Sequence, residues 1–328
     1  MAKLVLGLGS SHTPMLNMPG AHWPRYVERD VGLPLIDKEG RKISYDALLR
    51  AAEPGLAAFI TEAELAARQE RNQAAIHRLE QTLARAALDT LIIVGDDQME
   101  IFQNANLPSS LVYSGKTIRS LPFHDDLDRP DWLLAGFARN CEVSGARDYP
   151  VDADLAHHLI DTLIEREFDV AISNALPAGL GEGHAFGFVH KRLMEDQVIP
   201  VVPILLNTWY PPNQPSPLRC YRLGQAIAAA VASFPDETRV GILASGGLSH
   251  FVVLEDLDRT VIRALRDKDA ATLQSLPRDR LNAGSSEIRN WICVAGAVEH
   301  LSLDWIEYVP CYRTPAGTGT AMGFASWS

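Results

Sequence analysis

The sequence predicts an α/β fold with a mixed, mainly parallel central sheet that is flanked by helices. Short apolar runs at residues 3–8 and 90–97 have the length and composition of buried strands. A long segment at residues 62–87, in which apolar residues recur every three or four positions, lies between them and predicts an amphipathic helix. A strand, a helical crossover and a second strand in this order are typical of a parallel sheet.

The rest of the chain continues this alternation. We expect further strands at residues 168–176, 198–207 and 239–250, and further helices at residues 152–167, 221–234 and 285–301. Residues 111–131 predict a short strand and loop, whereas the tail at residues 308–328 has little periodicity and much glycine.

Local signals refine three of these elements. Asp152 or Asp154 lies near the start of its helix, where a carboxylate favours the helix dipole. Ser and Glu in the run SSEIRNW, which ends at Trp291, predict a capping arrangement. Two prolines in residues 198–207 predict a strand that is terminal in the sheet or irregular.

Length and composition set limits on organisation and partners. The chain has 328 residues, 47% of them apolar, and no low-complexity linker. We therefore expect a single catalytic domain over residues 1–328. The net charge of −11 comes from scattered acidic residues, which argues against nucleic acid as a partner. By base rate, a homodimer is the expected assembly.

The ends and the cysteines indicate the compartment. No apolar stretch approaches the roughly 20 residues that a membrane span needs. The N-terminal run predicts a first strand and not a signal peptide. The four cysteines stand far apart without a CxxC pair, which favours reduced thiols over a thiolate zinc site. We therefore expect a cytoplasmic protein.

Chemistry-bearing side chains collect where predicted strands end. His12 follows the first strand in GSSHTP, acidic residues follow the second in GDDQME, and His184 and His250 lie in the loops GLGEGHAFG and SGGLSHF. Glycine and serine leave room for a ligand, and ligands of open α/β sheets bind at this edge. The glycine-rich loops lack the lysine of a P-loop, and SGGLSHF is not a GxSxG elbow.

Several ordered motifs then resemble one family. GLGSSHTPML, the Gly-His loop at His184, SGGLSH at His250 and GSSEIRNW at Glu287 occur in the order seen in the extradiol dioxygenases of the protocatechuate 4,5-dioxygenase type, numbered class II. The resemblance runs from residue 3 to about residue 326 and is strongest to the 3-O-methylgallate 3,4-dioxygenase group. Segments similar to that group include HTPMLNMPGAHWPRYVERD, LIIVGDDQMEIF, NTWYPPNQPSPLRCYRLG and PCYRTPAGTGTAMGFA.

The resemblance implies an activity and a role for each matched residue. It implies opening of a catecholic, lignin-type aromatic acid such as 3-O-methylgallate, gallate or protocatechuate with O₂, by means of non-haem Fe(II). His12 and Glu287 match metal ligands, and His250 matches the acid/base histidine. His184 matches a histidine that orients substrate and bound oxygen.

The chain departs from the family pattern at the second ligand histidine. After Asp96 and Asp97, where the pattern has histidine, the sequence has Gln98. Glutamine is a neutral oxygen donor that binds Fe(II) more weakly than imidazole does. Gln98 can ligate directly, Asp97 or Glu100 can supply an oxygen instead, or a histidine from another loop can fill the position, with His124 as the first choice.

A carboxylated ring needs a polar or cationic anchor. Arg313 and Tyr312 in the tail are the expected substrate-binding residues, while Arg289 more often has a structural role at such a position. Trp291 and Phe186 could contact the ring, although ordinary core packing is the commoner role of such aromatics.

Two other functions remain open at this point. The loss of a histidine at Gln98 is compatible with a non-catalytic, metal-free binding protein of the same fold. His and Glu ligands also suit a divalent-metal hydrolase, whose turnover would not depend on O₂.

Overall fold

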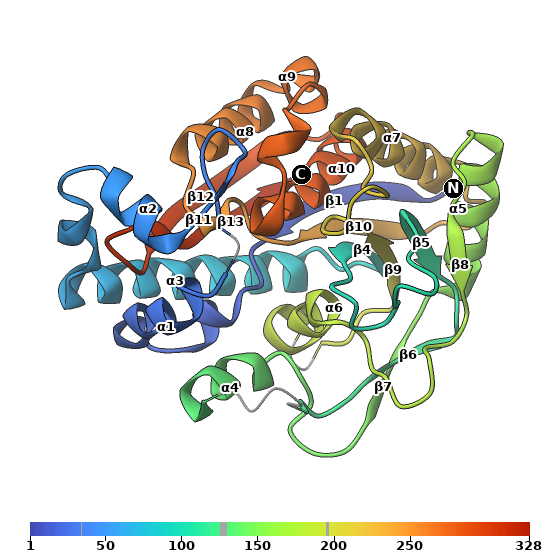
Figure 1. Ribbon diagram of the computed structural model, residues 1–328. Coiled ribbons are helices and arrows are strands. Elements are labelled where there is room, and N and C mark those ends of the chain that lie inside the picture. The colour runs from blue at the N-terminus through green and yellow to red at the C-terminus, as the bar shows by residue number, and fades with distance from the viewer. Residues whose placement is uncertain (34, 125–129, 195–196) are drawn as a thin grey trace.

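The computed structural model describes residues 1–33, 35–124, 130–194 and 197–328, and its centre is one mixed sheet (Figure 1). Within this part of the chain the sheet has nine strands in the order β11-β13-β1-β10-β4-β9-β5-β8, with β12 paired to β13. Strands β1, β10, β4 and β9 run parallel to one another, which confirms the predicted fold class.

The strands of this sheet are β1 (Lys3–Ser10), β4 (Thr90–Asp96), β5 (Ser110–Tyr113), β8 (Ala171–Ser173), β9 (Val201–Leu206), β10 (Arg239–Ser245), β11 (His250–Val252), β12 (Leu303–Tyr312) and β13 (Thr318–Trp327). Two small sheets pair β2 (Leu35–Ile36) with β3 (Lys42–Ile43) and β6 (Thr117–Ser120) with β7 (Arg147–Pro150). The helices are α1 (Val27–Asp30), α2 (Tyr45–Ala51), α3 (Glu62–Arg85), α4 (Asp131–Ala138), α5 (Ala153–Glu165), α6 (His184–Val189), α7 (Pro217–Ser233), α8 (Glu255–Asp267), α9 (Ala270–Gln274) and α10 (Ile288–Ala297).

Helices cover both faces of the sheet (Figure 1). Along β4, Ile92 and Val94 pack in one hydrophobic cluster with α5, α7 and α10, whereas Leu91 and Ile93 pack in a second cluster with α3 and α6. Because side chains alternate across a strand and both faces are buried, the strand is apolar throughout. This explains why a continuous apolar run was the right signal for the central strands.

Two helix starts follow from local capping. The side chain of Thr61 accepts a hydrogen bond from the backbone N–H of Glu64 at the start of α3, inside the predicted range. Asp152 is the N-cap of α5, because its Oδ1 accepts from the backbone N–H of Leu155 at 3.0 Å. Asp152, and not Asp154, is therefore the capping carboxylate of the predicted pair.

The capping arrangement predicted at SSEIRNW is wrong. Ser285 and Ser286 lie in a 3₁₀ turn (Ala283–Glu287) before α10, and neither caps the helix through its side chain. The carboxylate of Glu287 accepts a hydrogen bond from the backbone N–H of Gly247 at 2.6 Å, away from the helix start. The turn thus directs the glutamate out of α10 and toward the loop that follows β10.

The expectation for residues 198–207 is also wrong. Strand β9 lies inside the sheet between β4 and β5, and all six of its residues are buried. The pairing with β5 covers only Ile204–Leu206. Pro203 lies outside that pairing, so the N–H that proline lacks is not needed for a hydrogen bond to β5.

The tail forms a long hairpin that the sequence did not predict. Strands β12 and β13 have ten residues each and pair antiparallel through nine residue pairs, and β13 also pairs with β1 and β11. All ten residues of β13 are buried, which removes the alternation that reveals a half-exposed strand. In the segment 111–131, β5 and β6 supply strands, and residues 125–129 lie outside the described residues.

No helix in the described ranges is long and apolar enough to cross a membrane. The ends of β1, β4 and β10 lie at one edge of the sheet because these neighbouring strands are parallel. His12 follows β1 by two residues, Asp96 ends β4 and Ser245 ends β10. The fold therefore brings three of the predicted loops together.

Candidate active site

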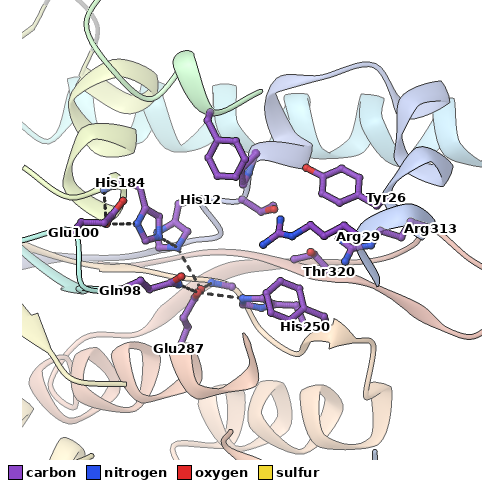
Figure 2. A pocket seen from close by; sticks show the side chains of 15 residues that line it. His12, Tyr26, Arg29, Gln98, Glu100, His184, His250, Glu287, Arg313 and Thr320 are labelled. Atoms are coloured by element: carbon purple, nitrogen blue, oxygen red, sulfur yellow. Dashed lines mark hydrogen bonds and ion pairs between the residues drawn. The ribbon is translucent and has the colours of Figure 1, made fainter. Parts of the chain in front are cut away.

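A cavity opens at this edge of the sheet (Figure 2). Its volume of about 240 Å³ is close to the small end of ligand pockets, roughly 300–1,000 Å³, and suits a single-ring ligand. It is lined by His12, Thr13, Pro14, Tyr26, Arg29, Gln98, Glu100, Phe137, His184, Gly247, His250, Phe251, Glu287, Arg313 and Thr320. Of the seven residues expected to form the site, six line this cavity, namely His12, Gln98, His184, His250, Glu287 and Arg313, and Tyr312 does not.

The tautomer of His12 follows from its hydrogen bonds. Its Nδ1 lies 3.0 Å from Ser245 Oγ, and that hydroxyl lies 2.6 Å from the carbonyl oxygen of Ala185. Because Ser245 gives its one proton to this carbonyl, Nδ1 of His12 is the donor to Ser245. The Nε2 atom of the neutral ring then carries a lone pair, which faces the cavity.

His184 is oriented in a similar way by a carboxylate. Its Nδ1 lies 2.6 Å from Glu100 Oε2, and its backbone N–H donates to the same oxygen at 3.1 Å. Burial disfavours the charged ring, but Glu100 outweighs this and raises the pKa of His184 to about 10. The Nε2 atom of His184 lies 3.2 Å from Nε2 of His12.

Two buried carboxylates face these rings. Glu287 Oε2 lies 3.3 Å and Asp96 Oδ1 4.0 Å from Nε2 of His12. Burial and the charge of Glu287 raise the pKa of Asp96 to about 6. Burial alone would raise the pKa of Glu287 too, but His250 and His12 hold it well below its usual value. Asp96 Oδ1 has no hydrogen-bond partner among the described residues.

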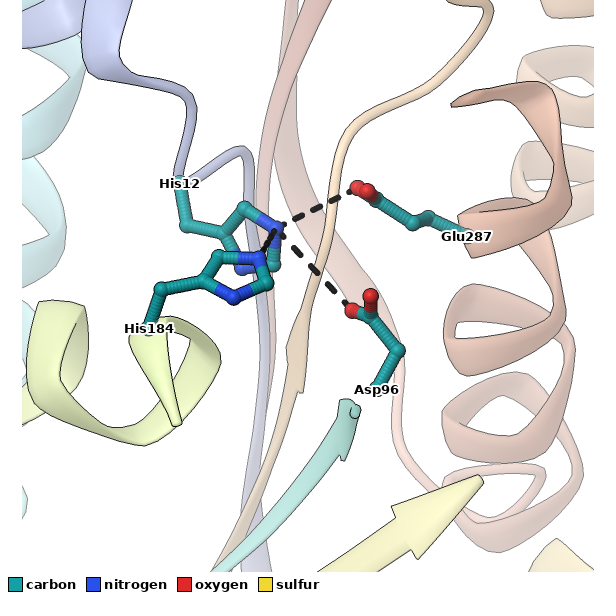
Figure 3. A group of neighbouring side chains, drawn as sticks. All are labelled: His12, Asp96, His184 and Glu287. Atoms are coloured by element: carbon teal, nitrogen blue, oxygen red, sulfur yellow. Dashed lines mark hydrogen bonds and ion pairs between the residues drawn. The ribbon is translucent and has the colours of Figure 1, made fainter. Parts of the chain in front are cut away.

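The donor set of His12, Asp96, His184 and Glu287 fits a divalent metal ion (Figure 3). One donor atom from each residue lies within 4.8 Å of the others. Ligands held at about 2.1 Å from one ion are themselves roughly 3.0–3.4 Å apart, which matches the His12–His184 and His12–Glu287 spacings. A buried carboxylate oxygen without a partner is a further sign that a cation belongs there.

Asp97, Glu100 and His124 were the other residues considered for the ligand position at Gln98, and none of them directs a free donor atom to the metal cluster. Asp97 accepts hydrogen bonds from the backbone N–H groups of Glu100, Ile101 and Phe102, so its carboxylate stabilises the loop that follows β4. Glu100 pairs with His184. His124 is exposed and is not among the described residues of the cavity wall.

Gln98 lines the cavity but presents its amide nitrogen to the carboxylates. Its Nε2 lies 3.2 Å from Asp96 Oδ2 and 3.4 Å from Glu287 Oε1. An N–H group donates and cannot ligate a cation. In this arrangement Gln98 therefore orients the two carboxylates.

His250 lies on the other side of Glu287. Its Nδ1–H donates to the carbonyl oxygen of Leu248 at 2.9 Å, and its Nε2 lies 3.1 Å from Glu287 Oε1. Burial opposes the charged ring, but Glu287 and Leu248 raise the pKa of His250. A Cβ at Gly284 would lie 2.1 Å from Cδ2 of His250, so only glycine permits this ring position.

The far end of the cavity is cationic. Arg29, Arg313, Tyr26 and Thr320 lie together there, across from His12, His184 and Gln98 (Figure 2). Arg313 is 2% exposed and is held by Asp30, with its Nε 2.8 Å from Oδ2. Its charge is thus already balanced within the wall. Arg29 is exposed, and its guanidinium lies 5.4 Å from the centre of the Phe251 ring.

The remaining predicted contacts are structural. The hydroxyl of Tyr312 donates to Glu255 at 2.8 Å. Buried Arg289 donates to the carbonyl oxygens of Pro215 and Leu281, and burial lowers its pKa to about 10. Trp291 and Phe186 are almost fully buried in the core and are not in the described cavity wall.

Sequence reasoning missed Asp96 and Arg29. Asp96 was noted only as part of a polar turn, although a carboxylate that ends a buried strand already marks it. Arg29 lies in an irregular stretch whose periodicity gives no sign of a site.

Curated relatives share part of this chain. A gallate dioxygenase of Pseudomonas putida is 32% identical over 117 residues, which cover 34% of this chain and 33% of that protein. A 2,3-dihydroxyphenylpropionate/2,3-dihydroxicinnamic acid 1,2-dioxygenase of Comamonas testosteroni is 32% identical over 125 residues, or 36% and 38% of the two chains. Its namesake in Mycolicibacterium smegmatis is 34% identical over 126 residues, again 36% and 38%. The chain thus matches little more than a third of the length of these relatives.

The family match is longer. Residues 67–323 match the family described as the catalytic LigB subunit of aromatic ring-opening dioxygenase. This confirms the resemblance to extradiol dioxygenases of the protocatechuate 4,5-dioxygenase type. The class number II expected from the sequence is corrected to III, which is the class of this fold. With most of its length covered, this chain belongs to the LigB family of aromatic ring-opening dioxygenases.

Proposed function

We propose that this protein is an Fe(II)-dependent extradiol dioxygenase that opens the ring of a catecholic aromatic acid with O₂. The observation that carries the proposal is the group of His12, Asp96, His184 and Glu287 at one end of a small cavity, with His250 beside it. Family membership and the names of the relatives support the same reaction class.

The donors suit iron, which would supply a redox centre that binds both a catecholate and O₂. Two imidazole nitrogens and two carboxylates would hold it, and the carboxylates balance its charge. Gln98 and the backbone N–H of Gly247 keep the carboxylates in place through their hydrogen bonds.

His250 supplies the proton chemistry of the proposed reaction. Leu248 fixes its Nδ1–H, so only Nε2 can exchange a proton toward the cavity. From that atom the ring can take the proton of a hydroxyl placed beside Glu287 and return it to a leaving oxygen. Proton transfer by such a positioned group contributes about 10²–10⁴-fold to rate.

The opposite end supports an acid substrate. Arg29 and Arg313 line it, and an arginine pairs with a carboxylate through two parallel hydrogen bonds. Because Arg29 is exposed at this end of the cavity whereas Arg313 is buried against Asp30, we propose Arg29 as the anchor of the substrate carboxylate. In this proposal Arg313 and Tyr312 do not bind the substrate. Phe137, Phe251 and Pro14 also line the cavity and offer apolar surface for the ring. 3-O-Methylgallate, gallate and protocatechuate all combine a ring carboxylate with vicinal oxygens.

Residues outside the family match also belong to the proposed unit. His12 and Arg29 precede residue 67 yet line the same cavity as Glu287. We therefore propose that residues 1–328 act as one catalytic domain. The predicted cytoplasmic location and homodimer remain predictions; light scattering of the purified chain measures the second.

The test is anaerobic loading with Fe(II), followed by addition of O₂ and a panel of catecholic acids. We expect a new ultraviolet or yellow absorbance from at least one acid, with one O₂ consumed per product and both atoms of ¹⁸O₂ in it. Iron-loaded protein that leaves the whole panel unchanged would refute the proposal. Turnover that is indifferent to O₂ would instead identify a hydrolase.

A further inference from the structure

We propose that His184 is itself a metal ligand in this chain, and that it supplies the imidazole missing at Gln98. Glu100 fixes its ring for this task. The inference rests on the metal dependence within the proposed function, but not on the reaction that the metal serves.

The first step is the direction of the His184 ring. Glu100 Oε2 accepts hydrogen bonds from both the Nδ1–H and the backbone N–H of His184. A ligating histidine usually gives its other ring N–H to a carboxylate or a carbonyl, which fixes the ring and makes the free nitrogen more basic. His184 shows this arrangement with Glu100, and His12 shows it with Ser245.

The second step is the contact between the two rings. The Nε2 atoms of the His184 and His12 rings lie 3.2 Å apart. A proton could join only this one pair, whereas Asp96 Oδ1 and Glu287 Oε2 face the same space. One divalent ion satisfies all four donors.

The third step is how the backbone permits the exchange of ligands. Gln98 gives its amide nitrogen to Asp96 and Glu287, so the strand-end position presents no lone pair to the centre. His184 reaches the same space as the first residue of α6. A Cβ at Gly183 would lie 2.8 Å from Glu100 Oε2, so a glycine here lets the loop approach the orienting carboxylate.

Metal binding by apoprotein tests this without a turnover assay. Chelated, anaerobic protein is titrated with Fe(II) and Co(II), and affinity is measured by calorimetry and by the visible Co(II) absorption. We expect His184→Asn to lose at least about 100-fold in affinity. Glu100→Gln should lose about 10–100-fold, as is typical for a residue that orients a ligand. His124→Asn, a matched loss of another histidine considered for this position, should bind like the wild type.

A ligand count provides an independent readout. Pulsed EPR of the Cu(II)-loaded protein should detect imidazole nitrogen from two rings in the wild type and from one in His184→Asn, with Glu100→Gln keeping both. Wild-type affinity and an unchanged ring count in His184→Asn would overturn the inference and return His184 to a role on substrate. A wild-type chain that binds none of these ions would overturn it too. Metal binding as expected without ring cleavage would end only the proposed reaction.

Discussion

Two arginines line the cationic end of the cavity, and we expect opposite results when each is replaced by methionine. Arg313 and Asp30 form a buried ion pair, with exposures of 2% and 0% for the two side chains. Asp30 also accepts a hydrogen bond from Thr318 Oγ1 at 2.6 Å. Removing Arg313 therefore leaves a buried carboxylate whose cationic partner is gone.

The magnitude follows from the burial of this pair. Removing one partner of a buried ion pair costs about 3–5 kcal/mol. For a chain of this size that corresponds to a fall in Tm of roughly 4–7 °C. In the double variant Asp30→Asn/Arg313→Met no charge is left buried, so most of the loss should be recovered.

Arg29→Met is the matched control in the same wall. Arg29 is exposed, so its replacement should change stability by less than about 0.5 kcal/mol. A charged hydrogen bond to a substrate carboxylate is worth about 1.5–3 kcal/mol, so KM for an acid should rise roughly 10–100-fold. KM for catechol, which has no carboxylate, should change little.

Thermal unfolding and steady-state O₂ uptake with protocatechuate and catechol measure both effects. Arg313→Met with a wild-type Tm and a selectively raised KM for the acid would refute the assignment. It would show that Arg313 binds the substrate carboxylate, as the sequence first indicated.

Three further substitutions test other parts of the site. His250→Asn should keep the bound metal and lower kcat about 10²–10⁴-fold, because only proton transfer is lost; loss of the metal would contradict this. Gly284→Ala should lower activity and Tm together, because its Cβ would lie 2.1 Å from Cδ2 of His250. Wild-type activity and Tm in this variant would show that the turn can move to make room for the methyl group. Burial raises the pKa of Asp258 to about 6 from 3.8, so its protonated form stabilises the fold fully below about pH 4 and that contribution, about 3 kcal/mol, is lost as the pH rises through 6. Asp258→Asn should therefore reduce the fall in the urea-unfolding free energy between about pH 4 and 7. An unchanged pH dependence would assign that fall to other groups.

The fold was predictable where one periodicity dominates. The run at residues 90–97 is apolar because both faces of β4 are covered, and α3 shows its amphipathic period over 24 residues. The hairpin of β12 and β13 was not predictable in this way, since β13 is buried on both faces yet rich in glycine and small residues. Its register depends on pairing with β1 and β11, which are distant in sequence.

The site was predictable to the extent that strand ends fix backbone positions. His12 follows β1, Asp96 ends β4, and both strands end at the same edge of the sheet, so the sequence placed both residues there although it did not identify Asp96 as a metal ligand. The direction of each side chain was not predictable. Gln98 stands where a ligand is expected, but its amide turns toward two carboxylates whose positions depend on β4 and on the turn before α10.

The two histidines of the cluster also depend on each other through the fold. Ala185, the residue after His184, accepts the hydrogen bond of Ser245, and Ser245 accepts that of His12. One helix turn thus places the His184 ring directly and orients the His12 ring through a single hydroxyl. Because both Nε2 atoms must face one point for a metal to bind, this shared support at α6 links the orientations of the two rings. The proposed replacement of a ligand at the end of β4 by His184 therefore uses a helix that already helps to orient His12.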